Sequence, residues 1–314
     1  MDRTKKRSPR EAFGKALVDL GKTDERIVVL DADLAASTQT KLFANEFPER
    51  FFDIGIAEQD LIGTAAGLSA VGKIPFAATF AVFATGRTYD QIRNTVCYSN
   101  FNVKIVGTHG GVTVGEDGAT HQALEDVALM ANLPNMNVIV PADYAETYSA
   151  IKYAATHEGP YYVRVARASL PDVFEDGVDI SPKAKVMTEG DSLTMITNGE
   201  TLQECIEAVE ELKTQGISVE LLHMPFVKPF DAESVLKSAQ KTGLVVTVEN
   251  HSVKGGLGSA VCELLSEKLP TKVIRIGVND EFGMSGTASE LMAHFGLDSK
   301  GIVKRIVEIL KWYN

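Results

Sequence analysis

The sequence predicts an α/β protein of two domains, each with a mostly parallel sheet between two layers of helices. Short apolar runs alternate with helical patterns along the whole chain, which is typical of parallel strands that helices cover on both faces. The length of 314 residues, of which 45% are hydrophobic, suggests two domains with full cores. The periodicity lapses between Leu170 and Lys185, which we interpret as a linker.

The first domain is expected to span residues 1–180. Its expected strands are Arg26–Leu30, Phe51–Ile54, Ile74–Thr79, Val103–Gly107, Asn137–Val140 and Tyr161–Val165. Helical patterns lie between several of them, at Arg10–Leu20, Ala57–Ala70, Thr85–Tyr98, Gln122–Ala131 and Tyr144–Thr156.

The second domain is expected to span residues 181–314, where the alternation restarts. Its expected strands are Leu193–Thr197, Ser218–His223, Leu244–Glu249 and Thr271–Ile276. Its expected helices are Leu202–Gln215, Ala232–Ala239, Ser259–Lys268 and Thr287–Phe295.

Charge and cysteine content argue against several classes of function. The formal net charge of −11 argues against a nucleic-acid-binding protein, which needs a basic patch. Cys97, Cys205 and Cys262 are scattered without metal-ligand spacing and favour a reducing, cytoplasmic location. The basic N-terminus lacks the apolar run of a signal peptide, so none is expected.

One apolar stretch raises the question of a membrane span. Lys73 is the only charged residue between Leu61 and Gly86. Several glycines and Pro75 divide this stretch into a helix, a turn and a strand. No membrane span is therefore expected.

The carboxylate of Glu58 stands at a strand-to-helix turn with mostly small or apolar neighbours. Phe51–Ile54 is expected to be a buried strand, and the helical pattern begins at Ala57. Open α/β sheets bind ligands at the carboxyl ends of their strands, so a partly buried Glu58 could share a proton with a ligand nitrogen there. The alternative is an ordinary acidic residue in a first helical turn, stabilised by the helix dipole.

A glycine-rich loop, residues 107–122, forms the second candidate site. It follows an expected strand and contains His109, His121 and Asp117. Histidine suits proton transfer near neutral pH, and aspartate can hold a hydroxyl group. Further Cys or His ligands at close spacing, which a metal site needs, are missing from the sequence around it. The alternative is a structural glycine-rich loop with polar caps.

Aromatic and basic residues supply further candidates. Phe80 and Phe83, three residues apart at a strand end, could offer a flat face to a ring-shaped ligand, although such pairs are also common in cores. The possible anion-binding residues are Arg10, Arg87, Arg164 and Arg167.

Taken together, these segments resemble the transketolase family of thiamine-diphosphate enzymes, specifically its pyrimidine-binding and C-terminal domains. The resemblance covers essentially the whole chain and is strongest in the run Gly-Glu-Asp-Gly-Ala-Thr-His-Gln, residues 115–122. It is also dense at Asp53–Gln59, Thr79–Phe83, His109 and Pro134–Met136.

The resemblance implies how the cofactor would be held. Glu58 corresponds to the glutamate that protonates N1′ of the aminopyrimidine ring of thiamine diphosphate. Phe83 corresponds to the residue that stacks on this ring, with Phe80 beside it, and Asp33 to an acid near the cofactor. Gly86 departs from the family, because many full-length members have an aromatic residue there.

The resemblance also implies a substrate site. His121 corresponds to a histidine close to the reacting hydroxyl groups, where it would assist proton transfer, and Asp117 to the acid that holds a hydroxyl of the donor sugar. The sugar phosphate would be bound by Ser37, His109, Arg10 and Arg167.

A second chain is implied by a missing motif. Full-length family members bind the diphosphate through magnesium with a Gly-Asp-Gly…Asn run, which this sequence lacks. The chain therefore resembles the smaller subunit of a split transketolase, without metal ligands of its own. Its partner would be an N-terminal transketolase subunit that holds Mg²⁺ or Ca²⁺, in an α2β2 heterotetramer.

Three other functions remain open. A 1-deoxyxylulose-5-phosphate synthase shares the Ile-Ala-Glu-Gln motif but is normally a single long chain. The β subunit of a 2-oxo acid dehydrogenase is also a half-enzyme, but its loop typically ends His-Ser-Gln, whereas this chain has Thr120-His121-Gln122. A non-catalytic binding or regulatory module would not need Glu58 and Asp117 together with both loop histidines.

Overall fold

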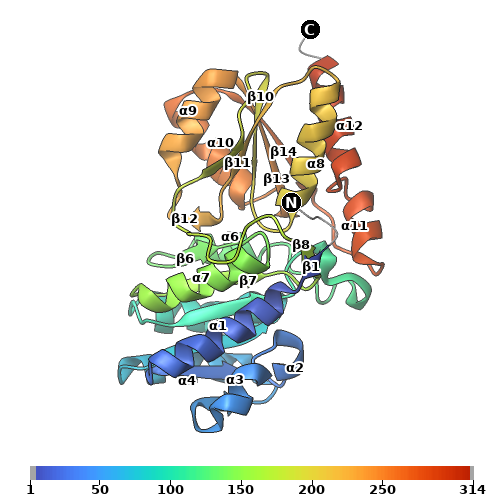
Figure 1. Ribbon diagram of the computed structural model, residues 1–314. Coiled ribbons are helices and arrows are strands. Elements are labelled where there is room, and N and C mark those ends of the chain that lie inside the picture. The colour runs from blue at the N-terminus through green and yellow to red at the C-terminus, as the bar shows by residue number, and fades with distance from the viewer. Residues whose placement is uncertain (1–4, 312–314) are drawn as a thin grey trace.

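Two large sheets, one above the other in Figure 1, organise the protein. The structure is a computed structural model that describes residues 5–311. The seven-stranded sheet has the order β12-β6-β7-β5-β4-β2-β3. Its strands are β2 (Ile27–Asp31), β3 (Phe51–Asp53), β4 (Ile74–Phe80), β5 (Lys104–Thr108), β6 (Asn137–Ile139), β7 (Tyr161–Val165) and β12 (Phe226–Lys228).

The first sheet is parallel except for β12, which comes from the second half of the chain and pairs antiparallel with β6. The six strands expected in the first half all form, within one or two residues of the predicted ends. One expectation about them is wrong: β3 is not buried, because it lies at the sheet edge, and Phe52 is 38% exposed.

Helices cover both faces of this sheet, as predicted. Along β4, Phe76 packs into the core with α1 (Pro9–Thr23) and α7 (Tyr144–Thr156). The next residue, Ala77, packs into the opposite core with α4 (Glu58–Ala70) and α6 (Asp126–Ala131). Successive strand residues point to opposite faces, which fixes this division.

The predicted helix Thr85–Tyr98 is largely not α-helical. It consists of the wide π-helical turns η2 (Phe83–Arg87) and η3 (Ile92–Cys97) around the short α5 (Tyr89–Gln91). The predicted helix Gln122–Ala131 starts only at Asp126, because the Gln122 side chain instead bonds loop carbonyls. The unpredicted elements α2 (Ala35–Thr38), α3 (Lys41–Glu46) and η1 (Pro48–Arg50) follow β2.

The second sheet has the order β14-β13-β10-β11-β9. Its strands are β9 (Lys185–Thr188), β10 (Leu193–Thr197), β11 (Val219–His223), β13 (Leu244–Ser252) and β14 (Lys272–Val278), and only β9 pairs antiparallel. The expected division near residue 180 stays a prediction, and β12 crosses it by joining the first sheet.

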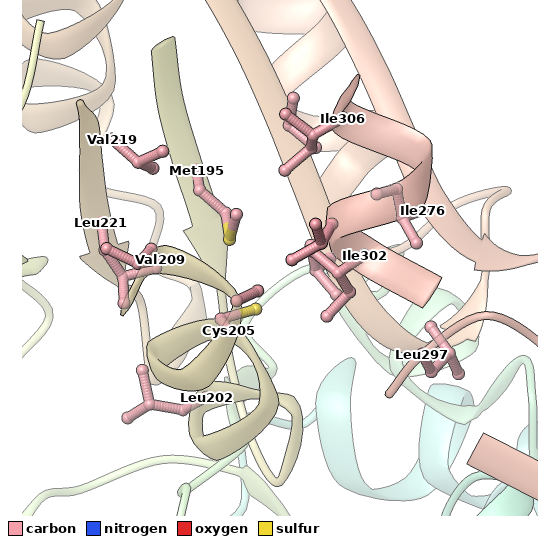
Figure 2. Close-up of a cluster of buried hydrophobic side chains, with 14 of the residues drawn as sticks. Met195, Leu202, Cys205, Val209, Val219, Leu221, Ile276, Leu297, Ile302 and Ile306 are labelled. Carbon is pink, nitrogen blue, oxygen red and sulfur yellow. The ribbon is translucent and has the colours of Figure 1, made fainter. Parts of the chain in front are cut away.

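Helices flank the second sheet as well. In Figure 1, α8 (Thr201–Thr214), α11 (Ala288–His294) and α12 (Ser299–Lys311) lie along one side of it, and α9 (Ala232–Thr242) and α10 (Leu257–Lys268) along the other. Figure 2 shows the core on the first side, where Met195 of β10 and Cys205 of α8 face Ile302 of α12. The helix α12 is not among the helices expected from the sequence.

The expected linker contains a short strand. β8 (Leu170–Pro171) pairs antiparallel with β1 (Lys6–Arg7), and the Arg7 guanidinium lies 2.8 Å from the Asp172 carboxylate. Within residues 5–311, no helix has the length and apolar character that a membrane crossing requires.

A buried contact between an acid and a histidine joins the two halves of the chain. Glu146 in the first turn of α7 and His223 at the end of β11 are fully buried, with Oε2 and Nε2 2.7 Å apart. Burial raises the pKa of Glu146, but His223 and Lys185 outweigh this effect, so its pKa lies below the usual value. The pair therefore links both domains through a buried charge.

We expect His223→Ala to lower the free energy of unfolding by about 3 kcal/mol, because it leaves the buried Glu146 carboxylate without its closest partner. Urea unfolding at pH 7 measures this change. The control is Arg26→Ala, which breaks an exposed pair with Asp24 and should have little effect. Equal effects of the two substitutions would contradict the role of the buried pair.

Candidate active site

The candidate site lies at the carboxyl ends of neighbouring parallel strands in the first sheet. β4 ends at Phe80, β5 is followed directly by His109, and Arg167 stands two residues after β7. β5 lies between β4 and β7, so the three residues emerge at one edge of the sheet. Ligands of open α/β sheets bind at such edges.

Four rings form a cluster there. Phe80 lies parallel to Phe83 with a centroid distance of 5.9 Å, and it stacks on His109 at 3.8 Å. His121 meets Phe83 edge-on at 5.4 Å, while its Nδ1 lies 2.9 Å from the hydroxyl of Thr120. Phe83 and His121 are half-buried, so a flat ligand can reach this cluster from outside.

Glu58 is the first residue of α4, and its side chain is only 4% exposed. Arg87 donates from Nη1 to Glu58 Oε1 at 2.8 Å. The same guanidinium lies over the Phe83 ring, 4.3 Å from its centroid. Arg87, an anion-binding candidate in the sequence, thus pairs with an acid of the protein itself and connects Glu58 to the ring cluster.

Two arginines form the cationic end of the site. Arg10 donates from Nη1 to the carbonyl of Ser37 at 2.7 Å and from Nε to the carbonyl of Arg167 at 3.2 Å. Arg167 pairs with the exposed Glu116 at 3.1 Å. Burial and the charge of Arg167 lower the pKa of Arg10. This end of the site, with Ser37 beside it, suits an anionic group.

His109 lies between the cationic end and the rings. It is buried, adopts a left-handed backbone with φ of 61°, and places Nδ1 2.9 Å from the hydroxyl of Thr108. Burial lowers the pKa of its ring to about 3, with further contributions from the charges of Arg10, Arg167 and His121. His109 is therefore neutral at physiological pH and can donate one hydrogen bond and accept another.

Asp33 and Asp117 remain apart from these contacts. Both are exposed, and the backbone N–H of Asp33, rather than its side chain, donates to Asp53 Oδ1 at 3.0 Å. Arg164 is not available to an anion, because it is buried against Asp126 with Nε 3.1 Å from the carboxylate. Its other nitrogens donate to the carbonyls of Asn250 and Ala123.

The second domain holds the glycine-rich loop through a buried polar network that the sequence analysis missed. Asn250, at the end of β13, accepts from the N–H of Val112 at 2.9 Å and donates to Glu200 at 2.6 Å. Glu200 also accepts from the Thr113 hydroxyl at 2.7 Å. The only sequence signal was the polar run Glu249-Asn250-His251, which ends an otherwise apolar strand.

The Gln122 side chain makes a second set of contacts that hold the loop. The buried Gln122 amide donates to the carbonyls of Val112 and Gly115 and, at 2.9 Å, to Met284 of the second domain. The loop therefore depends on both domains for its shape. A hollow of about 770 Å³ lies along β14, but none of the candidate site residues lines it.

Comparison with known proteins identifies both parts of the chain. Residues 5–173 match the transketolase pyrimidine-binding domain, and residues 182–302 match the transketolase C-terminal domain. A Methanocaldococcus jannaschii protein named as a transketolase C-terminal section is 50% identical over 306 residues, which cover 96% of each chain.

Two further relatives cover nearly the whole chain. A 6-deoxy-6-sulfo-D-fructose transketolase subunit of a Clostridium species is 42% identical over 97% of this chain and 95% of its own. The solved structure of a split-gene transketolase, described as an inactive β4 tetramer, superposes with a TM-score of 0.90 at 50% identity. It covers 97% of this chain and 98% of its own.

His109 should make the stability of the protein depend on pH. Below pH 6.5 the unfolded chain takes up a proton at this ring, whereas the folded protein resists protonation until about pH 3. The stabilisation is therefore complete above pH 6.5 and is lost progressively as the pH falls towards 3. We expect His109→Asn, which tolerates the left-handed backbone, to flatten this dependence in urea unfolding. The exposed His294→Asn serves as control, and an equal slope in the two variants would contradict the assignment.

Asn250→Ala should loosen the loop, because it leaves the Val112 N–H without a partner and removes one of the two donors to Glu200. We expect a loss of about 2 kcal/mol in the free energy of unfolding and faster hydrogen exchange at the Val112 amide. Asn279→Ala, which removes an exposed amide of the same domain, is the matched control. Unchanged hydrogen exchange in the loop of Asn250→Ala would contradict the proposed role of Asn250 in holding the loop.

Proposed function

The chain belongs to the transketolase family, and we propose that it is the subunit of a split transketolase that holds the pyrimidine ring of the cofactor. The buried Glu58 at the start of α4, beside the half-buried Phe83, is the observation that carries this proposal. A carboxylate and an aromatic face fit a planar ring that has both a basic nitrogen and a flat surface. The resident Arg87, itself planar and rich in N–H groups, makes both kinds of contact.

The family is thiamine-diphosphate dependent, and this cofactor supplies the carbon that carries the transferred two-carbon ketol unit. In our proposal Glu58 holds a proton for N1′ of the pyrimidine ring, Phe80 and Phe83 orient that ring, and Asp33 lies near it. His121, which contacts Phe83, moves a proton at the reacting hydroxyl groups.

The cationic end would bind the phosphate of a sugar. Arg10 and Arg167 supply charge, and Ser37 and the neutral His109 supply hydrogen bonds. This clamp would position a ketose phosphate donor and an aldose phosphate acceptor, and Asp117 would hold a donor hydroxyl. The Clostridium relative, whose name includes a sulfo sugar, suggests that the clamp accepts other anions too.

We propose that a separate N-terminal transketolase chain completes the enzyme, as an α2β2 heterotetramer, and holds the diphosphate with Mg²⁺ or Ca²⁺. The inactive β4 tetramer of the split-gene relative supports the need for a second kind of chain. The described residues 5–311 contain no cluster of three or more His, Cys, Asp or Glu side chains suited to a metal.

The free cysteines are consistent with a reducing compartment such as the cytoplasm.

The proposal is tested by mixing the chain with the N-terminal transketolase section of its own organism, thiamine diphosphate and Mg²⁺. We expect two-carbon transfer from xylulose 5-phosphate to an aldose phosphate, measured by product chromatography. A failure to transfer from any ketose phosphate would overturn the proposal. Decarboxylation of pyruvate would instead favour a synthase or dehydrogenase subunit.

Glu58→Gln should reduce kcat in this assay by about 10²- to 10⁴-fold, because the amide cannot hold the transferable proton. Circular dichroism and gel filtration should show unchanged folding and assembly. Asp60→Asn is the matched control, since Asp60 lies in the same helical turn but is exposed. Substantial activity in Glu58→Gln would refute the assigned role.

A further inference from the structure

Arg87 is held at the candidate cofactor site by both its main chain and its side chain. It ends the π-helical turn η2, which begins at Phe83. Its carbonyl accepts from the Gln59 side chain at 3.1 Å, and its guanidinium contacts Glu58 and the face of Phe83. The residue thus joins the first turn of α4 to the ring cluster.

The two ends of this ion pair differ in exposure. The Glu58 side chain is 4% exposed, whereas that of Arg87 is 48% exposed. A buried carboxylate without a partner is strongly destabilising, so Arg87 offsets the burial of Glu58. The half-exposed arginine can leave towards solvent, whereas Glu58 is fixed at the helix start.

Both contacts of Arg87 coincide with those that a pyrimidine ring needs. An arginine guanidinium is planar, donates N–H groups to carboxylates and stacks on aromatic faces. A protonated aminopyrimidine is likewise planar and would donate to Glu58 while stacking on Phe83. The Arg87 guanidinium already lies over the Phe83 ring and on Glu58, so a ligand that makes both contacts has to displace it.

We propose that Arg87 is a positioning residue that stands in for the pyrimidine ring until the cofactor binds. The inference rests on the proposed function and concerns how the same site is kept ready. Arg87 holds Glu58 and Phe83 in the arrangement that the ring requires, and the ring then displaces its guanidinium. Displacement reduces the apparent cofactor affinity, because only the fraction of molecules with Arg87 swung out can bind.

Opposite effects on stability and affinity would distinguish this role from a merely structural one. In Arg87→Ala, thermal unfolding of the free chain should occur at a lower temperature, since Glu58 loses its partner. The same substitution in the complex with the N-terminal chain should lower the dissociation constant of thiamine diphosphate about 3- to 10-fold. Isothermal titration calorimetry with thiamine diphosphate and Mg²⁺ measures this constant without requiring turnover.

Two further variants sharpen the test. Arg93→Ala is the matched control, because the exposed Arg93 bonds the neighbouring Asn94 and should leave both quantities unchanged. Arg87→Lys keeps the charge without the planar fork, and its dissociation constant should lie between those of Arg87→Ala and the wild type.

The possible results separate this inference from the proposed function. If the wild-type complex binds thiamine diphosphate but Arg87→Ala binds it equally well or more weakly, the stand-in role is overturned and the proposed function stands. If the wild-type complex binds no thiamine diphosphate, the proposed function fails and the stand-in role fails with it.

Discussion

The glycine-rich loop of the candidate site depends above all on the buried guanidinium of Arg164. It pairs with Asp126 of the first domain and donates to the main chain of Asn250 in the second, so one side chain connects both domains. The glycine-rich loop crosses directly over it. A Cβ atom at Gly110 would collide with Arg164, and one at Gly111 would collide with Asn250. The glycines there allow close approach of the loop to this polar core.

One end of the candidate site carries positive charge, although the net charge of the molecule is negative. The chain carries a net charge of −11, yet Arg10 and Arg167 lie together at one end of the site. Burial, together with the charges of these two arginines, keeps His109 neutral by lowering its pKa. A phosphate bound between them would oppose those charges and make His109 easier to protonate. Overall charge is therefore a poor guide to what this surface attracts, because local fields decide binding.

Much of the fold could be predicted from the sequence because its central strands are continuous apolar runs. β7 and β10 form at the predicted residues, since both are wholly buried. The predictions failed where the structure depends on contacts between residues that are far apart in the sequence. The wide turns of η2 and η3 depend on packing rather than on a distinct pattern, and β12 joins a sheet whose other strands lie far away in the sequence.

The same distinction applies to the candidate site. Phe80 and His109 come together because adjacent parallel strands end at one edge, which a sequence can indicate. The pairing of Glu58 with Arg87 across 29 positions, and the bracing of the loop by Asn250, could not be predicted, because both depend on tertiary contacts. Asp33 and Asp117 are exposed, so this chain alone offers little that would fix their side chains.

If two chains form one active site, a carboxylate buried in one of them needs a partner even before the second chain and the cofactor bind. In the proposed enzyme Glu58 serves the reaction only when a pyrimidine ring is present, yet the carboxylate is buried in the free chain as well. Arg87 supplies this partner, because it forms an ion pair with Glu58 from a half-exposed position that it can leave. A fixed, fully buried cation would stabilise the free chain equally well but would compete too strongly with the cofactor. In this proposal, the partial exposure of Arg87 allows the same carboxylate to be stable in the free chain and available to the cofactor in the assembled enzyme.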